Sequence, residues 1–150
     1  MKTDAAKQLE ELLGEFLPPT AALARDCLTS VRRLVPGALE RVYDAYNALA
    51  IGFATGDSLR ETFIHVAVYP RHVNLGFNRG VALPDPTGAL VGSGSAIRHV
   101  RIDEAARMRD PAVAALVRAA AAEAGFRGRL GQRGEIRIVR IYARRRPRRP

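Results

Sequence analysis

The chain has one cysteine and no tryptophan among its 150 residues. The single cysteine, Cys27, excludes an intrachain disulfide and a cysteine-based metal cluster, and its helical spacing with Leu23 and Val31 predicts a small core residue rather than a reactive thiol. No apolar run approaches the roughly 20 residues of a membrane span, and the first residues lack the features of a secretory signal. We therefore expect a cytoplasmic protein without a membrane span.

Lysine is scarce, because only Lys2 and Lys7 accompany 22 arginines. The net charge is +9 and is unevenly distributed. Residues 1–125 hold 14 basic and 14 acidic groups, whereas residues 126–150 hold 10 arginines and only Glu135. The sequence therefore predicts a neutral body followed by a strongly basic segment.

Helical spacing of apolar residues predicts three helices. The first covers residues 4–17, with Asp4 as its N-cap, and should end at the prolines that follow. The second covers residues 21–35, with Thr20 as its N-cap. A third begins at an Asp-Pro pair, a favourable helix start, and covers residues 110–125.

The hydrophobic period changes to two between residues 39 and 102, which is typical of half-buried strands. The alternating runs lie at residues 49–53, 64–68, 73–77, 97–102 and 135–142. The last run has arginines on both faces, which suits an edge strand. Helices, then strands, then helices predict an α+β fold, a two-layer sandwich with helices packed on one face of an antiparallel sheet.

Three motifs follow one another between Tyr69 and Ile102: HVNLGF, GVALPDP and GSGSAIRHV. Their order resembles the YdhG-like family of small bacterial domains, whose pattern is an HVxLGF strand, a GAxLPDP turn and a GxGxxIRHV strand. The resemblance covers roughly residues 20–125 and implies a helix-plus-sheet architecture. The family consists largely of domains of unknown function. Some relatives are described as frataxin-like iron chaperones that support iron–sulfur assembly, so the resemblance also implies that alternative.

The chain divides into three expected parts. Residues 1–19 form a helical extension that could mediate a homodimer, and residues 20–142 form one YdhG-like α+β domain. Residues 143–150 have no apolar side chain after Ala143, so we expect a disordered basic tail. Its arginines, which could contact RNA, DNA or an anionic membrane surface, are Arg144, Arg145, Arg146, Arg148 and Arg149. The alternative is a tail that only improves solubility.

A candidate ligand-binding patch lies within the motif region. If a hairpin brings His72 near His99, the two histidines could flank one patch with Asn74, Arg79 and Arg98. Such a patch is basic, which favours a small anionic ligand or a protein partner over a metal ion. The alternative is that the histidines are ordinary hydrogen-bonded or surface residues of a sheet.

The glycine-rich segment offers a second, weaker candidate. The backbone amides of Gly92, Ser93, Gly94 and Ser95 could form an anion-binding nest, although a tight connection between strands is the simpler interpretation. The segment contains neither a GxxxxGK[ST] phosphate loop nor a GxSxG nucleophile elbow. Asp85, between two prolines, is expected to accept backbone amides in a turn.

These patterns favour a non-catalytic accessory or binding domain with an unidentified ligand or protein partner, and they predict no cofactor and no metal site. One alternative is the iron chaperone, for which the acidic cluster is Asp4, Glu10, Glu11 and Glu15. Another is a module that binds nucleic acid weakly through the arginine tail.

Overall fold

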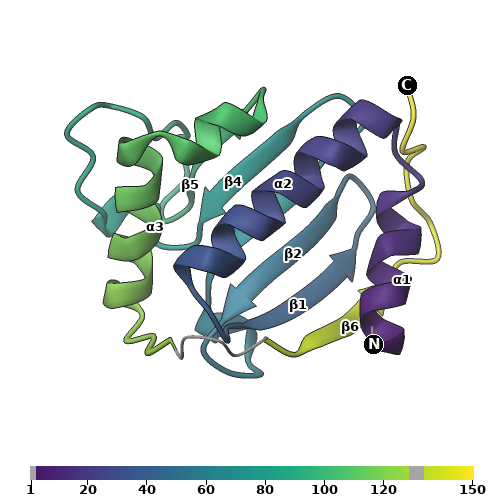
Figure 1. Cartoon of the computed structure of the whole chain (residues 1–150), viewed down its shortest axis with the longest axis horizontal. Helices are drawn as coiled ribbons and strands as arrows, with labels where there is room; N and C mark the ends of the chain where they lie inside the picture. The colour runs from purple at the N-terminus through teal and green to yellow at the C-terminus, as the bar shows by residue number, and fades with distance from the viewer. Residues whose placement is uncertain (1–2, 129–133) are drawn as a thin grey trace.

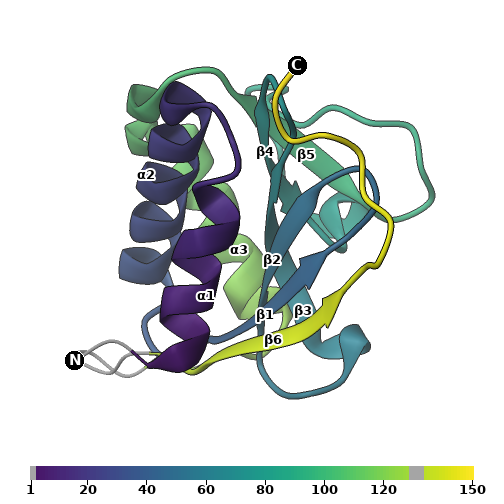
Figure 2. The same cartoon turned by 90° about the vertical axis from the view of Figure 1, so that its right-hand side faces the viewer.

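Six strands form one sheet in the order β5-β4-β3-β2-β1-β6, and three α-helices lie on one of its faces (Figure 1 and Figure 2). The computed structural model describes residues 3–128 and 134–150. The strands are β1 (Leu39–Asp44), β2 (Leu49–Ala54), β3 (Thr62–Val68), β4 (Val73–Phe77), β5 (Arg98–Ile102) and β6 (Ile136–Ile141). The helices are α1 (Asp4–Leu13), α2 (Pro18–Leu34) and α3 (Pro111–Glu123). This arrangement confirms the predicted α+β two-layer sandwich.

The sheet is mixed rather than wholly antiparallel. Strands β1 to β5 form an antiparallel meander, whereas β6 pairs parallel to β1 at the sheet edge. A parallel partner requires a long crossover connection, and the chain supplies it by placing α3 between β5 and β6. β1 was not identified from the sequence as a separate strand. Part of the predicted loop 125–134 lies outside the described residues.

The junction between α1 and α2 differs from the prediction. The hydroxyl of Thr3 accepts a hydrogen bond from a first-turn amide at 3.2 Å, so Thr3 and not Asp4 is the N-cap of α1. Pro18 starts α2 instead of ending α1, because proline at the first helical position loses no hydrogen bond. The N-cap of α2 is therefore Leu17 rather than Thr20.

The core lies between the helices and the sheet face that they cover. Its fully buried large side chains are Leu9, Leu13, Phe16, Leu28, Val31, Leu49, Ile51, Phe53, Ile64, Leu75, Phe77 and Ile102. Cys27 is buried among them, and burial, followed by the charge of Asp26, raises the pKa of its thiol to about 12. Cys27 is therefore the core residue that its spacing predicts. None of the helices in the described ranges combines the length and the apolar character needed to cross a membrane.

Residues 143–150 lie against the body of the protein instead of forming a free tail. Asp44, at the end of β1, is 1% exposed. Its carboxylate accepts a hydrogen bond from Nη2 of Arg148 at 2.7 Å and forms an ion pair with Arg145. The Arg148 guanidinium also lies 5.7 Å from the ring centroid of Phe16. These contacts do not match the expected disorder. The physical reason for the ordered contact is the buried carboxylate of Asp44, which needs a cationic partner. The composition of residues 143–150 does not reveal this carboxylate.

The same segment contacts the C-terminal end of α1 (Figure 1). Arg149 donates to the carbonyl of Glu15 at 3.1 Å, and Arg145 lies 3.1 Å from the Glu15 carboxylate. Cations at this end of a helix are favoured, because its last carbonyl groups carry partial negative charge. Residues 143–150 therefore join α1 to the end of β1.

The double substitution Arg145→Ala/Arg148→Ala should lower the free energy of unfolding by about 3–5 kcal/mol, because Asp44 would stay buried without a cationic partner. Urea denaturation measures this change. The control Arg144→Ala/Arg146→Ala removes the same charge from exposed positions and should change stability by only about 0.5 kcal/mol. Equal losses in the two proteins would show that pairing with Asp44 is not the cause of the lost stability.

Candidate functional site on the open face of the sheet

The second face of the sheet, which we call the open face, lies opposite the helices (Figure 2). Side chains alternate between the two faces of a strand. Val42, Ile51, Val66 and Leu75 are fully buried on the helix side. The residues between them therefore point to the open face, where the described part of the chain places no α-helix.

Strand pairing arranges the open-face residues in two rows that cross the whole sheet. The first row contains Arg137, Arg41, Gly52, His65, Gly76 and His99. The second row contains Arg140, Tyr43, Ala50, Ala67, Asn74 and Arg101. Neither row contains a carboxylate. Glycine and alanine occupy much of the middle, while arginine, histidine and tyrosine stand toward both edges, so the face suits an anionic ligand.

His65 is held firmly within the first row. Its Nδ1 lies 2.8 Å from Oδ1 of Asn78, and its ring covers Gly76 so closely that any Cβ there would overlap it. Burial lowers the pKa of His65, the hydrogen bond to Asn78 opposes this shift, and the nearby charge of His99 adds to it. The imidazole is therefore neutral near pH 7, donates from Nδ1 and has a structural role.

The predicted ligand patch is partly assembled on this face. Asn74 and His99 lie in the two rows on adjacent strands. His72 lies at the β3–β4 turn, where its ring stacks on Tyr69 with 4.5 Å between centroids. Burial and then the charge of Arg101 lower the pKa of His72. Asn74 and His99 therefore belong to the open face, whereas His72 lies at the end of the sheet and lines a hollow together with Leu23 and Asp26 of α2.

The other two predicted patch residues do not join them. Arg79 forms an ion pair with Glu123 of α3 at 3.1 Å, on the helix side of the sheet. Arg98 alternates in phase with Val100, which faces the core, and its guanidinium donates to the carbonyl of Gly94 at 2.6 Å. The prediction took Arg98 and its neighbour His99 together, but adjacent strand residues point to opposite faces.

The glycine-rich segment forms an exposed connection beside β5. The predicted nest, residues 92–95, includes Gly92 with φ of +132°, a conformation that favours glycine. The carbonyl at Gly94 is the acceptor for Arg98. Asp85 accepts the amides of Ala89 at 2.8 Å and Leu90 at 3.0 Å, which confirms its predicted turn role. The segment is therefore built by internal contacts, and anion binding by its amides stays a prediction.

Arginine–tyrosine pairs are the part of the open face that the sequence prediction missed. The Arg41 guanidinium lies 5.6 Å from the ring centroid of Tyr43, and that of Arg140 lies 4.2 Å from the ring of Tyr142. The signal was present as two short repeats, RVY at residues 41–43 and RIY at residues 140–142. In a strand, this spacing places both residues of a pair on one face.

A third arginine–tyrosine group continues this line at the β1–β2 turn. Tyr46 is 37% exposed, and the guanidinium groups of Arg144 and Arg146 lie 6.0 Å and 5.6 Å from its ring centroid. We call the whole set the Arg–Tyr strip. Its members are Arg41, Tyr43, Tyr46, Arg140, Tyr142, Arg144 and Arg146.

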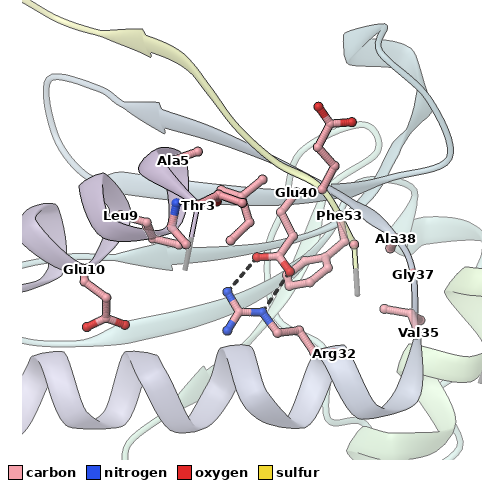
Figure 3. A pocket seen from close by; sticks show the side chains of 14 residues that line it. Thr3, Ala5, Leu9, Glu10, Arg32, Val35, Gly37, Ala38, Glu40 and Phe53 are labelled. Carbon is pink, nitrogen blue, oxygen red and sulfur yellow. Dashed lines mark hydrogen bonds and ion pairs between the residues drawn. The ribbon is translucent and has the colours of Figure 1, made fainter. Parts of the chain in front are cut away.

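A pocket of about 520 Å³ lies on the opposite side, between α1, α2 and β1 (Figure 3). Its lining includes Leu9 and Phe53, together with a pair formed by Arg32 and Glu40. Nε and Nη2 of Arg32 donate to the two carboxylate oxygens of Glu40 at 2.8 Å and 2.7 Å. Glu40 is 3% exposed, so this bidentate pair neutralises a buried charge. We interpret it as a structural link between α2 and β1.

The acidic cluster expected for iron does not form a metal site in the structure. Glu10 pairs with Arg25 at 2.9 Å, and Glu15 pairs with Arg145 at 3.1 Å. Within residues 3–128 and 134–150, no group of three or more histidine, cysteine, aspartate or glutamate residues is placed to hold a metal ion. The iron-chaperone alternative stays a prediction.

Comparison with protein-family models, with curated proteins and with solved structures finds no match to this chain. Membership of the YdhG-like family stays a prediction that rests on the three sequence motifs. The functional interpretation therefore depends on the geometry of the open face.

The substitution Gly76→Ala should lower the free energy of unfolding by about 1–3 kcal/mol, because the new methyl group overlaps the ring of His65. The same substitution in a His65→Ala background should cost much less, which urea denaturation of the four proteins would show. Gly94→Ala is the control, since nothing lies within 4 Å of a Cβ at that position. Equal costs in the two backgrounds would contradict the contact.

Stability should fall as the pH drops below the ordinary histidine pKa of 6.5, in part because the folded-state pKa of His65 is lowered. The unfolded chain, in which His65 has its ordinary pKa, binds the proton more tightly than the folded chain. The contribution of neutral His65 to the free energy of unfolding is therefore fully present above pH 6.5 and declines below it. The measurement is urea denaturation at about pH 7.5 and about pH 5.5. His65→Asn should show a smaller decline, and an identical decline would assign the effect to other groups.

Proposed function

We propose that this protein is a non-catalytic cytoplasmic binding domain that holds an anionic partner on the open face of its sheet. The observation that carries the proposal is the pair of rows across the six strands, which present arginine, histidine, tyrosine and asparagine without a carboxylate. Anions are attracted to such a concentration of one sign of charge. The fold thus acts as a rigid support for the charged residues.

Three arginines of the two rows, Arg101, Arg137 and Arg140, are available to a ligand. Arg101 pairs with Asp103 at 3.0 Å, and Arg137 pairs with Asp57 and with Glu135 at 3.1 Å, but all of these side chains are substantially exposed. Exposed ion pairs contribute little free energy, so a ligand anion can replace these carboxylates. Arg140 has no carboxylate within 4.0 Å among the described residues, and its guanidinium rests on a tyrosine ring.

The basic segment contributes to this surface in a narrower way than the sequence suggested. Arg145 and Arg148 are committed to Asp44 inside the protein. Arg144 and Arg146 remain exposed beside Tyr46 and extend the positive surface beyond β6. A polyanion would therefore meet the segment and the open face together.

Heparin affinity chromatography tests the proposal. The double variant Arg101→Ala/Arg140→Ala should elute at clearly lower salt than the wild-type protein, because two charges leave the face and polyanion affinity depends on the number of ionic contacts. The control Arg109→Ala/Arg118→Ala removes the same charge from exposed positions outside the two rows, on the helical layer. An equal shift in the two variants would show that only net charge matters and would overturn the proposal.

A further inference from the structure

We propose that the anionic partner is single-stranded nucleic acid, bound along the Arg–Tyr strip. The inference rests on the proposed function, since it assumes that the open face binds an anion, and it adds the chemical class of that anion. Charge alone would suit many polyanions. The tyrosines distinguish nucleic acid, because single strands bind to grooves and surfaces that combine positive charge with aromatic rings on which bases stack.

The strip places the two kinds of contact side by side. Tyr43 of β1 is paired in register with Arg140 of β6, and the Arg140 guanidinium rests on Tyr142. On the other side of Tyr43 along the strand stands Arg41. Neighbouring strands lie about 4.8 Å apart and alternate residues of one strand about 6.7 Å apart. Tyrosine rings and arginine charges therefore alternate at short intervals over two adjacent strands.

The strip also has a direction. It follows β1 and β6 towards the β1–β2 turn, where Tyr46 carries Arg144 and Arg146. A bound strand would run from the sheet onto this turn, with bases against the rings of Tyr43, Tyr142 and Tyr46. The guanidinium groups that lie over these rings can move to meet the phosphates and can also stack on bases.

Other occupants fit this surface less well. A double helix is usually read by an α-helix or a ribbon that enters a groove, whereas the open face presents small residues such as Gly52, Ala50 and Ala67 in its middle strands. A second copy of the chain would bring two faces of the same charge together, which like-charge repulsion opposes. A flexible single strand can follow the strip without either difficulty.

Binding of a labelled oligouridine and a labelled oligothymidine to the full chain, followed by fluorescence anisotropy, tests the inference. The variant Tyr43→Leu/Tyr142→Leu should weaken binding on the order of tenfold or more, because stacking contributes to affinity at each base. Tyr43→Phe/Tyr142→Phe should keep the affinity, since the rings remain. Tyr69→Leu, at the β3–β4 turn and outside the Arg–Tyr strip, is the control and should also keep the affinity.

Heparin elution of the same variants separates the two proposals. The leucine variant should elute from heparin like the wild-type protein, because its charges are unchanged. If the phenylalanine variant still binds the oligonucleotide with wild-type affinity, the weaker binding of the leucine variant is due to lost stacking. Oligonucleotide affinity that is unchanged by the leucine substitutions, while heparin retention depends on Arg101 and Arg140, would overturn the nucleic-acid inference and leave the proposed function standing. Heparin retention that does not depend on Arg101 and Arg140 would overturn both.

Discussion

The protein depends on one constraint, which is that the described α-helices all cover the same face of its sheet. Helices bury the apolar residues of each strand on that side, and burial of this surface supplies the main driving force for folding. The residues that alternate with them point to the open face and do not pack against the helices. Arginine, tyrosine and histidine can therefore stand in register across strands without weakening the core. Both the candidate site and its breadth follow from this division of the sheet into a packed face and a displayed face.

A buried ion pair completes the arrangement at the sheet edge. Asp44 lies at the end of β1, and a carboxylate in that position would be costly without a partner. Arg148 and Arg145 provide the partner. They also hold the final described residues against the β1–β2 turn, next to Tyr46. One electrostatic requirement thus secures both the fold and the extension of the Arg–Tyr strip.

The sequence predicts much of this architecture because hydrophobic periods are local. The helices, the meander of β2 to β5 and the edge position of β6 were all recognisable, and the α+β class followed. The parallel pairing of β6 with β1 was not, since it joins distant segments and depends on the path of the chain around α3. The same limit applied to Pro18, because a proline can either end the helix before it or begin the helix after it, and the conformation of the preceding turn decides between the two.

The candidate site was predicted only in part for related reasons. His99 and Asn74 were grouped together, and the antiparallel pairing of β4 with β5 brings them to one face although residues 78–97 separate the two strands. Arg98 was grouped with them by proximity in sequence, although the strand alternation sends it to the other face. Arg41 and Arg140 could be associated only once the register of β1 and β6 was known. A basic segment that reads as disordered in isolation proved to contact a carboxylate about a hundred positions earlier in the chain.

The position of β6 has a consequence for the order of assembly. During synthesis the residues of β1 to β5 emerge before those of β6, since the chain is made from its N-terminal end. β6 and the arginines that follow it arrive only after α3 has been made. Four of the seven residues of the Arg–Tyr strip lie in these last elements. The nascent chain therefore contains five of the six strands before it contains all the residues of the Arg–Tyr strip, and the proposed surface is complete only when the last strand is in place.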